Sequence, residues 1–290
     1  MSPRRRLGAV AAFLAVAVVG CSPAPLRSDG QRTPAPSPSP AAPIAVVVDQ
    51  FRDGYASGTI VLQLDDTTAS GVTVTRAELV DPRFEDGTTW SGTTELSPGY
   101  PISLPAATAS PRCGASDDDV PSVRVTLAGG GPVVVPAADP HRVLPRIHSE
   151  KCFALRVSKS AGLRLDDTLT ETGPARTATL ELRADPPPTP GAREDLVLAS
   201  VSNTTLLDED PAAPWPTNVR IEPGGTPIPL TMRPARCDPH AVAEDKVGTL
   251  IPLTIRVGDA TGVVKVPASD ALRTKIYAFV ARACGWASTG

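Results

Sequence analysis

Residues 90–113 read WSGTTELSPGYPISLPAATASPRC, and residues 215–237 read WPTNVRIEPGGTPIPLTMRPARC. Each stretch begins with a tryptophan, reaches a Pro-Gly pair eight residues later, continues with Pro-Ile-x-Leu and ends on Arg-Cys. After each stretch, a strand-like run and a glycine turn lead to a Val-Pro pair, and another cysteine follows. Landmarks in one order at near-constant offsets indicate an internal repeat. The sequence therefore predicts a single fold present in two copies.

Within each copy, apolar and polar residues alternate with the period of a half-buried strand. Ile60, Leu62 and Leu64 show this alternation in the first copy, and Leu180 and Leu182 show it in the second. Turns rich in Gly and Pro separate six or seven short runs of this kind in each copy. We expect a mainly β chain with two tandem immunoglobulin-like sandwich domains.

A helical period precedes the last cysteine of the second copy. Ser269-Asp270 resembles a helix N-cap with an acid in the first turn, and apolar residues follow on one helical face at positions 272, 276, 279 and 283. The matching stretch of the first copy starts at Asp139-Pro140. Because Pro145 interrupts that stretch, we expect only a broken turn there. A short helical segment before the last cysteine is thus predicted for each copy.

The N-terminus has the order of an export signal, with Arg4 to Arg6, an uncharged run to Val19 and a small residue before Cys21. The apolar run is too short to span a bilayer. The sequence Val18-Val19-Gly20-Cys21 resembles the bacterial lipobox, which implies cleavage before Cys21 and a diacylglyceryl group on its thiol. A plain secretory signal is the alternative, and the arginines leave Sec and twin-arginine export open. We expect a lipid anchor on the outer face of the plasma membrane.

The remaining chain divides into a tether and the two copies. Residues 21–43 carry the lipidated cysteine and a segment rich in Pro, Ser and Ala, which cannot build a core. We place the signal peptide at 1–20, the first β-domain at 44–152 and the second at 153–290. Because no linker separates the copies, little relative motion between them is expected.

Charge limits the classes of partner. Removing Arg4, Arg5 and Arg6 from the 28 basic residues leaves 25 against 31 acidic residues, a formal net charge of −6. Nucleic acid and anionic lipid both favour clustered Lys and Arg, so neither is expected as the main partner.

Four cysteines remain besides Cys21. An even number in an exported chain indicates disulfides, and four cysteines allow three pairings. Because the repeat places one pair in each copy, we expect Cys113 to pair with Cys152 and Cys237 with Cys284. Zinc is the alternative, but the spacings include no Cys-x-x-Cys.

The landmarks also carry a resemblance. The order Trp, Pro-Gly, Arg-Cys, Val-Pro and a final cysteine, as in Ile147-His-Ser-Glu-Lys-Cys152, is similar to a group of uncharacterised actinobacterial secreted proteins and lipoproteins. The similarity covers most of the chain after the tether. It implies the fold and the cellular address, and it implies no activity and no site residues.

No sequence motif of a known enzyme class is present, and no cofactor is expected. His141 and His148 are seven residues apart, but Pro145 between them disfavours a shared metal. The run Asp117 to Asp119 is interpreted as a solvated acidic loop and not as a calcium site, and so is the run Asp208 to Asp210. A carbohydrate or peptide cleft is the alternative for the second run, because it lies beside Trp215 in the sequence. The weak binding candidates are a matched tryptophan and a matched arginine from each copy: Trp90, Trp215, Arg112 and Arg236.

These features predict a non-enzymatic binding or structural module of the cell envelope. Its partner would be an envelope protein, a polymer or a small ligand. The alternatives are an enzyme of unrecognised type with a site between the copies, and an accessory subunit of a transport or cell-wall assembly system.

Overall fold

Strands account for most of the regular structure, as the sequence predicts. The computed structural model describes residues 43–286, except 117, 173–175, 188–190 and 192, and the residues from Ala42 onward form one compact unit. The signal peptide, Cys21 and all of the tether except Pro43 lie outside the described residues. The first half contains strands β1 (Ile44–Asp49), β2 (Thr59–Asp66), β3 (Val72–Val80), β4 (Thr89–Leu96), β5 (Ile102–Ala107), β6 (Ser122–Leu127) and β7 (Pro132–Ala138), with a 3-10 turn, η1 (Arg52–Gly54), after β1.

The seven strands of the first half are hydrogen-bonded in the order β4-β3-β6-β7-β1-β2-β5. All neighbours are antiparallel except β1 and β7, which run parallel and pair at Val46–Ala137 and Val47–Ala138. This parallel pair joins strands that a sandwich would keep in separate sheets. The alternating residues Ile60, Leu62 and Leu64 are fully buried, which confirms the predicted inward face of β2.

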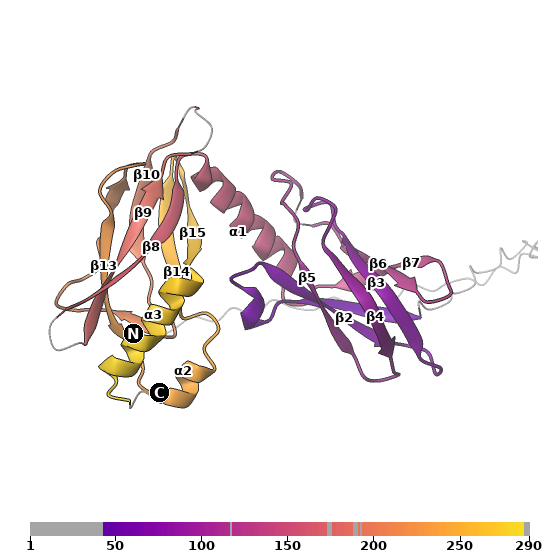
Figure 1. Ribbon diagram of the computed structural model, residues 1–290. Coiled ribbons are helices and arrows are strands. Elements are labelled where there is room, and N and C mark those ends of the chain that lie inside the picture. The colour runs from indigo at the N-terminus through magenta and orange to yellow at the C-terminus, as the bar shows by residue number, and fades with distance from the viewer. Residues whose placement is uncertain (1–42, 117, 173–175, 188–190, 192, 287–290) are drawn as a thin grey trace, which may run out of the picture. The chain divides into compact units, whose positions relative to one another are not determined.

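The second half forms two separate four-stranded sheets. Their orders are β12-β10-β14-β15 and β11-β13-β9-β8, and every pair is antiparallel. Figure 1 shows β8, β9 and β13 side by side, with α3 lying along β8. The strands are β8 (Gly162–Thr172), β9 (Thr177–Asp185), β10 (Leu196–Val201), β11 (Leu207–Glu209), β12 (Val219–Ile221), β13 (Ile228–Pro234), β14 (Leu250–Val257) and β15 (Ala260–Pro267), and the helices are α1 (Val143–Ser158), α2 (Pro239–Ala243) and α3 (Asp270–Ala283).

Two disulfides close the halves in the pairing that the repeat predicts. Cys113 is bonded to Cys152, and Cys237 is bonded to Cys284, across 39 and 47 residues of sequence. Each bond ties the connection that follows the Arg-Cys landmark to the last helix of its own half.

The prediction of a broken turn at Pro145 is wrong. Helix α1 runs without a break from Val143 to Ser158, and Pro145 is its third residue. In the first turn of a helix the backbone N–H has no intrahelical acceptor, so proline costs no hydrogen bond there. Both carboxylate oxygens of Asp139 accept from helix N–H groups, those of Val143 at 2.7 Å and Leu144 at 2.9 Å.

Helix α1 also differs from the predicted short segment in its length. Cys152 lies inside the helix, and six more residues follow it, so the boundary placed between 152 and 153 falls within one helix. The two hydrophobic cores explain this continuity. Val143, Leu144 and Ile147 are buried in the core of the first half, whereas Val157 is buried in the core of the second half. One rigid helix therefore contributes to both cores.

Helix α3 agrees with its predicted period and cap. The Ser269 hydroxyl accepts from the backbone N–H of Leu272 at 3.0 Å, and Leu272, Ile276 and Phe279 are fully buried. Cys284 is the C-cap residue, so in this half the last cysteine does end the helix.

Candidate functional site

The two halves differ most in the segment between the tryptophan and the Pro-Gly landmark. In the first half, β4 forms a strand from Thr89 to Leu96. In the second half, the matching residues 214–221 form a strand only over β12, from Val219 to Ile221. Pro214 and Pro216 have no N–H to donate to a sheet, and Asn218 has a φ of 55°, which no strand accommodates. The chain therefore leaves the sheet at this point.

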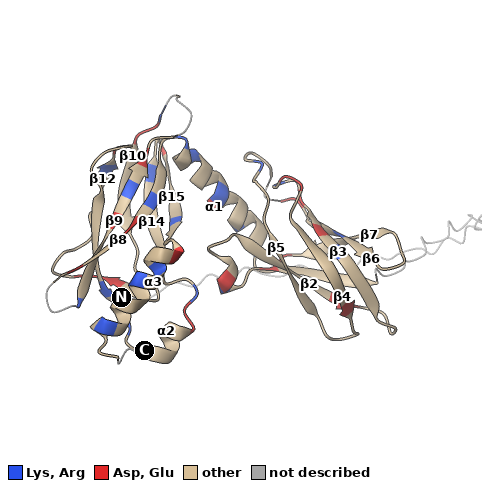
Figure 2. Cartoon of the chain, in the orientation of Figure 1, with Lys and Arg blue, Asp and Glu red and all other residues tan. Residues whose placement is uncertain are grey.

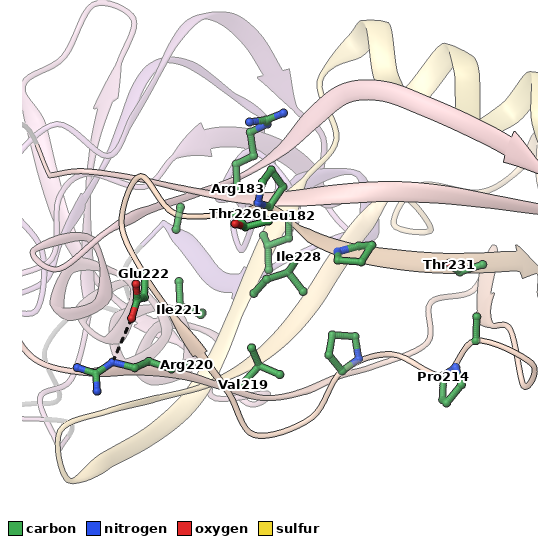
Figure 3. A pocket seen from close by; sticks show the side chains of 15 residues that line it. Leu182, Arg183, Pro214, Val219, Arg220, Ile221, Glu222, Thr226, Ile228 and Thr231 are labelled. Carbon is green, nitrogen blue, oxygen red and sulfur yellow. Dashed lines mark ion pairs between the residues drawn. The ribbon is translucent and has the colours of Figure 1, made fainter.

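The departure of this segment opens a groove of about 600 Å³ in the second half. Figure 3 shows β13 with its side chains on one side and the segment from Pro214 to Glu222 on the other. Leu182, Ile221 and Ile228 come from the inner faces of the two sheets and make the surface between these walls apolar. Four prolines line the walls: Pro214, Pro216, Pro227 and Pro229.

The groove runs beside an uncovered stretch of β13. Strand β11 pairs only with residues 232–234 of β13, and the Thr231 carbonyl is bonded to Asp210 and Trp215, so residues 228–230 have no strand neighbour on that side. The carbonyl oxygen of Thr231 points to this side, because it accepts from the Trp215 indole Nε1 at 2.7 Å. Carbonyls two residues apart on a strand point the same way, so the Pro229 carbonyl also faces the groove. Because proline has no backbone N–H, Pro229 offers the groove a hydrogen-bond acceptor and no donor.

Hydrogen bonds hold the departing segment in place. Trp215 is buried, and its backbone N–H donates to the Glu209 carboxylate. The Asp210 carboxylate accepts from the N–H of Ala212 at 3.1 Å, and the Asp210 N–H donates to the Thr231 carbonyl at 3.3 Å. The acidic run 208–210, interpreted from the sequence as a solvated loop, thus positions the wall of the groove.

Paired charges lie at the rim. The Arg183 Nε donates to Asp166 at 2.6 Å and its Nη2 donates to Glu181 at 2.9 Å, while Arg220 pairs with Asp195 at 2.5 Å. Hydrogen bonds from Thr168 and then from Arg183 hold the pKa of Asp166 below its ordinary value. Figure 2 shows basic and acidic residues interspersed over these strands. The rim is therefore polar without a strong net charge.

The two tryptophans predicted as matched candidates have different environments. Trp215 is buried under the groove wall, with both of its N–H groups bonded. Trp90 lies in β4, packs against the core of the first half and covers Gly92, where a Cβ atom would come within 2.7 Å of the ring. Trp215 is thus buried in the core, whereas Trp90 packs against its core and is only half-buried.

The two matched arginines also differ. Arg112 donates to the carbonyl of Phe84 and lies 3.8 Å from Asp86. Arg236 is exposed and has no ion pair with any residue that the structure describes. Neither arginine lines the groove.

The histidines and the first acidic loop form no common centre. His148 is buried, with its Nε2 at 3.1 Å from the Arg112 carbonyl and its ring edge-on to Phe84, whereas His141 lies in the exposed turn before α1. Asp117 lies outside the described residues. Within residues 43–286, apart from the undescribed positions, no group of three or more His, Cys, Asp or Glu side chains could hold a metal ion.

Sequence reasoning allowed a cleft beside Trp215 only as an alternative and did not identify the residues that line the groove. The signal was present, because the eight residues that match β4 contain two prolines in the second copy and none in the first. The repeat indicates that the two copies are similar, so by itself it does not predict that these prolines change the path of the chain in one copy.

Comparisons with known proteins add little. No family model matches the chain, and no curated protein matches it. Among the solved structures that it resembles are a protein of unknown function from Porphyromonas gingivalis W83 (15% identity, 79% of this chain and 100% of that one, TM-score 0.21), a beta-D-mannosidase from Dictyoglomus thermophilum (12%, 74% and 21%, 0.21) and the YadV chaperone (11%, 77% and 98%, 0.19). The chain spans about a fifth of the mannosidase. Likenesses at these TM-scores assign neither fold nor function.

Among the described residues, no helix combines the length and the apolarity that crossing a membrane requires.

Proposed function

We propose that this chain is a lipid-anchored, extracytoplasmic lipoprotein that acts as a non-enzymatic binding module of the cell envelope. In this proposal Cys21 carries the lipid, residues 22–43 are the tether, and the groove of the second half is the binding site. The observation that carries the binding role is that groove, with its apolar surface, proline walls and uncovered strand edge.

Strand order supports two tandem immunoglobulin-like domains. In the second half, β8, β9, β13 and β11 form one sheet and β10, β12, β14 and β15 form the other, which is the partition of an immunoglobulin-like sandwich. In the first half, β1, β2 and β5 match the first sheet and β3, β4, β6 and β7 match the second. The β1–β7 pair then joins the two sheets along one edge.

The two disulfides support an extracytoplasmic address, because such bonds persist in oxidising compartments. The lipobox-like sequence before Cys21 supports a lipid anchor there. Binding rather than catalysis fits the groove, since its two arginines are held by carboxylates and its surface is made largely of proline and aliphatic side chains.

The anchor is tested by mass spectrometry of the chain extracted from membranes. A mature chain that begins at Cys21 with an added diacylglyceryl mass is expected, and a Cys21→Ser variant should appear in the culture medium. An unmodified cysteine in the wild-type protein, or a variant that stays with the membrane, contradicts the proposed anchor.

The groove is tested by filling it. Val219 lines the groove, so Val219→Trp should block it, while Val263→Trp places the same side chain on an exposed position of β15 as a matched control. After formaldehyde treatment of intact cells, the wild type and the control should form the same larger adduct. Val219→Trp should form much less of it at an unchanged melting temperature. An equal yield from all three contradicts the proposed site.

A further inference from the structure

A second pocket lies mainly on the second half, apart from the groove. It has a volume of about 680 Å³ and lies between α2 with its following turn, on one side, and α3, on the other. Tyr277 and Arg273 line it from α3, Trp286 lines it from just beyond α3, and Lys246 and Thr249 line it from the turn. Asp53 and Ala56, which follow β1 in the first half, also line it.

Covalent and hydrogen bonds fix the walls of this α2–α3 pocket. The Cys237–Cys284 disulfide ties the start of the α2 segment to the end of α3. The Asp245 carboxylate accepts from the Tyr277 hydroxyl at 3.0 Å, from the N–H of Gly248 at 2.8 Å and from the Thr205 hydroxyl at 2.5 Å. These bonds occupy Asp245 within the protein, so it positions Tyr277 and the turn. A pocket with fixed walls loses little entropy when a ligand binds.

The lining offers aromatic surface beside hydrogen-bonding groups. Trp286 and Tyr277 are half-buried, so each keeps part of its ring exposed to the pocket. Burial, followed by the nearby Asp245 carboxylate, raises the pKa of Tyr277 to about 12, so its hydroxyl stays protonated at neutral pH. Lys246 and Arg273 supply donors, and Thr249 supplies a hydroxyl.

The charges of the lining nearly cancel. Lys246 and Arg273 are balanced by Asp245 and Asp53, and Arg273 is also 3.0 Å from Asp270. A phosphorylated or otherwise strongly anionic ligand favours a net positive site, which this pocket lacks. An uncharged ligand with one apolar face and several hydroxyl groups matches both the aromatic rings and the polar rim. A sugar ring has that chemistry, because its C–H groups form an apolar face and its hydroxyls surround it.

We infer that the α2–α3 pocket binds an uncharged sugar unit of an oligosaccharide, with the sugar's C–H face against Trp286 and its hydroxyl groups bonded to Lys246, Arg273 and Thr249. The matching segment of the first half differs, because its described residues, 114–116 and 118–121, form no helix and include no aromatic side chain. The inference is independent of the groove, which lies on other elements of the same half.

The test is calorimetric titration of the full chain, purified in a detergent without a sugar headgroup, with maltotriose, cellotriose, chitotriose and mannotriose. At least one of these is expected to bind with a Kd of about 1 mM, the range of a small ligand in one open pocket. Trp286→Ala should weaken that binding about tenfold by removing the aromatic surface. Tyr100→Ala, which removes an aromatic side chain that is 74% exposed elsewhere, should leave binding unchanged.

Arg273→Ala provides a second variant, because Arg273 is exposed and its loss removes no core contact. It should weaken binding while the melting temperature stays that of the wild type. The inference is overturned when none of the four trisaccharides binds, or when Trp286→Ala and Arg273→Ala both bind as tightly as the wild-type chain.

Discussion

Strand β4 and residues 214–221 occupy matching places in the two halves, yet only β4 is a strand throughout. In β4, Trp90 lies over Gly92 and the strand completes the edge of its sheet. In residues 214–221, two prolines and a left-handed Asn218 carry the chain away, and Trp215 plugs the core from outside any strand. The two halves thus both use the tryptophan to pack against a core, and they differ in the path of the segment that follows it. The groove of the second half can open without loss of the core because the other strands and Trp215 keep that core closed.

The largest expected loss of stability comes from removing the disulfide that each half contains. Each disulfide closes a loop of similar length, so chain entropy predicts that each stabilises the protein by about 4 kcal/mol. The double variants Cys113→Ala/Cys152→Ala and Cys237→Ala/Cys284→Ala should therefore lose nearly equal free energies of unfolding in denaturant titrations. A large inequality would show that the halves are not energetically equivalent copies.

The next largest loss of stability is expected from a buried ion pair of the first half. The side chains of Asp81 and Arg83 form an almost fully buried ion pair, with Nη2 to Oδ2 at 2.6 Å and Nε to Oδ1 at 2.9 Å. Asp81→Ala leaves the guanidinium buried without its carboxylate and should cost about 3 kcal/mol in denaturant titrations. The double variant Asp81→Leu/Arg83→Met should recover much of that loss, and no recovery would mean that the pair's geometry matters more than its charges.

The matched tryptophans should differ in the same assay. Trp215→Phe removes a buried indole and its 2.7 Å bond to the Thr231 carbonyl, so a loss of about 2 kcal/mol is expected. Trp90→Phe should cost less than about 1 kcal/mol, since Trp90 is only half-buried and donates no hydrogen bond that fixes a loop. Equal losses would remove the distinction between a core plug and a strand residue.

At alkaline pH, Tyr277 and Lys151 should change the stability of the protein in opposite directions. Tyr277 has its pKa raised from 10.0 to about 12, so between these values the folded protein holds a proton that the unfolded chain releases. Its contribution to stability is complete below pH 10 and is lost as the pH rises through about 12. Burial lowers the pKa of Lys151 from 10.5, so just below pH 10.5 the unfolded chain binds more protons and stability rises with pH.

Denaturant titrations across this pH range check both signs. Tyr277→Phe should flatten the fall in stability above pH 10, and Lys151→Met should flatten the rise below 10.5. Unchanged slopes in both variants would show that neither group is perturbed in the folded protein.

The smallest stability effect is expected at a single pair of matched residues. Pro229 of β13 and Ser103 of β5 occupy the same place in the repeat, and both are exposed on edge positions. Exchanging them as Pro229→Ser and Ser103→Pro should change stability by less than about 0.5 kcal/mol. Pro229→Ser adds an N–H to the groove wall, so it should alter ligand binding more than stability, and a large loss of stability would mean that this edge is not open.

The sequence alone predicts some of the strands, helices and disulfides of this fold. The alternation at Ile60, Leu62 and Leu64 and the cap at Ser269 predicted their strand and helix, because local period and local hydrogen bonding determine these features. The repeat predicted the disulfides, because it fixed which cysteines belong together. The prediction of a broken turn at Pro145 was wrong, because the effect of a proline depends on its distance from the start of the helix, and the sequence did not show where that helix starts.

The candidate site was beyond prediction for a related reason. The groove depends on where residues 214–218 go after leaving the sheet and on how much of β13 the short β11 covers, and both follow from tertiary packing. The length of α1 likewise depends on two cores that bury opposite ends of the same helix.

The difference between the two matched edges can be measured in living cells. A photo-crosslinking amino acid is placed at position 229, on the groove wall, or at position 103, its equivalent in the first half, and intact cells are irradiated. A discrete adduct is expected from position 229 and none from position 103, at equal amounts of folded protein. Adducts from position 103 alone, or equal adducts from both positions, would contradict the proposal that the groove of the second half is the binding site.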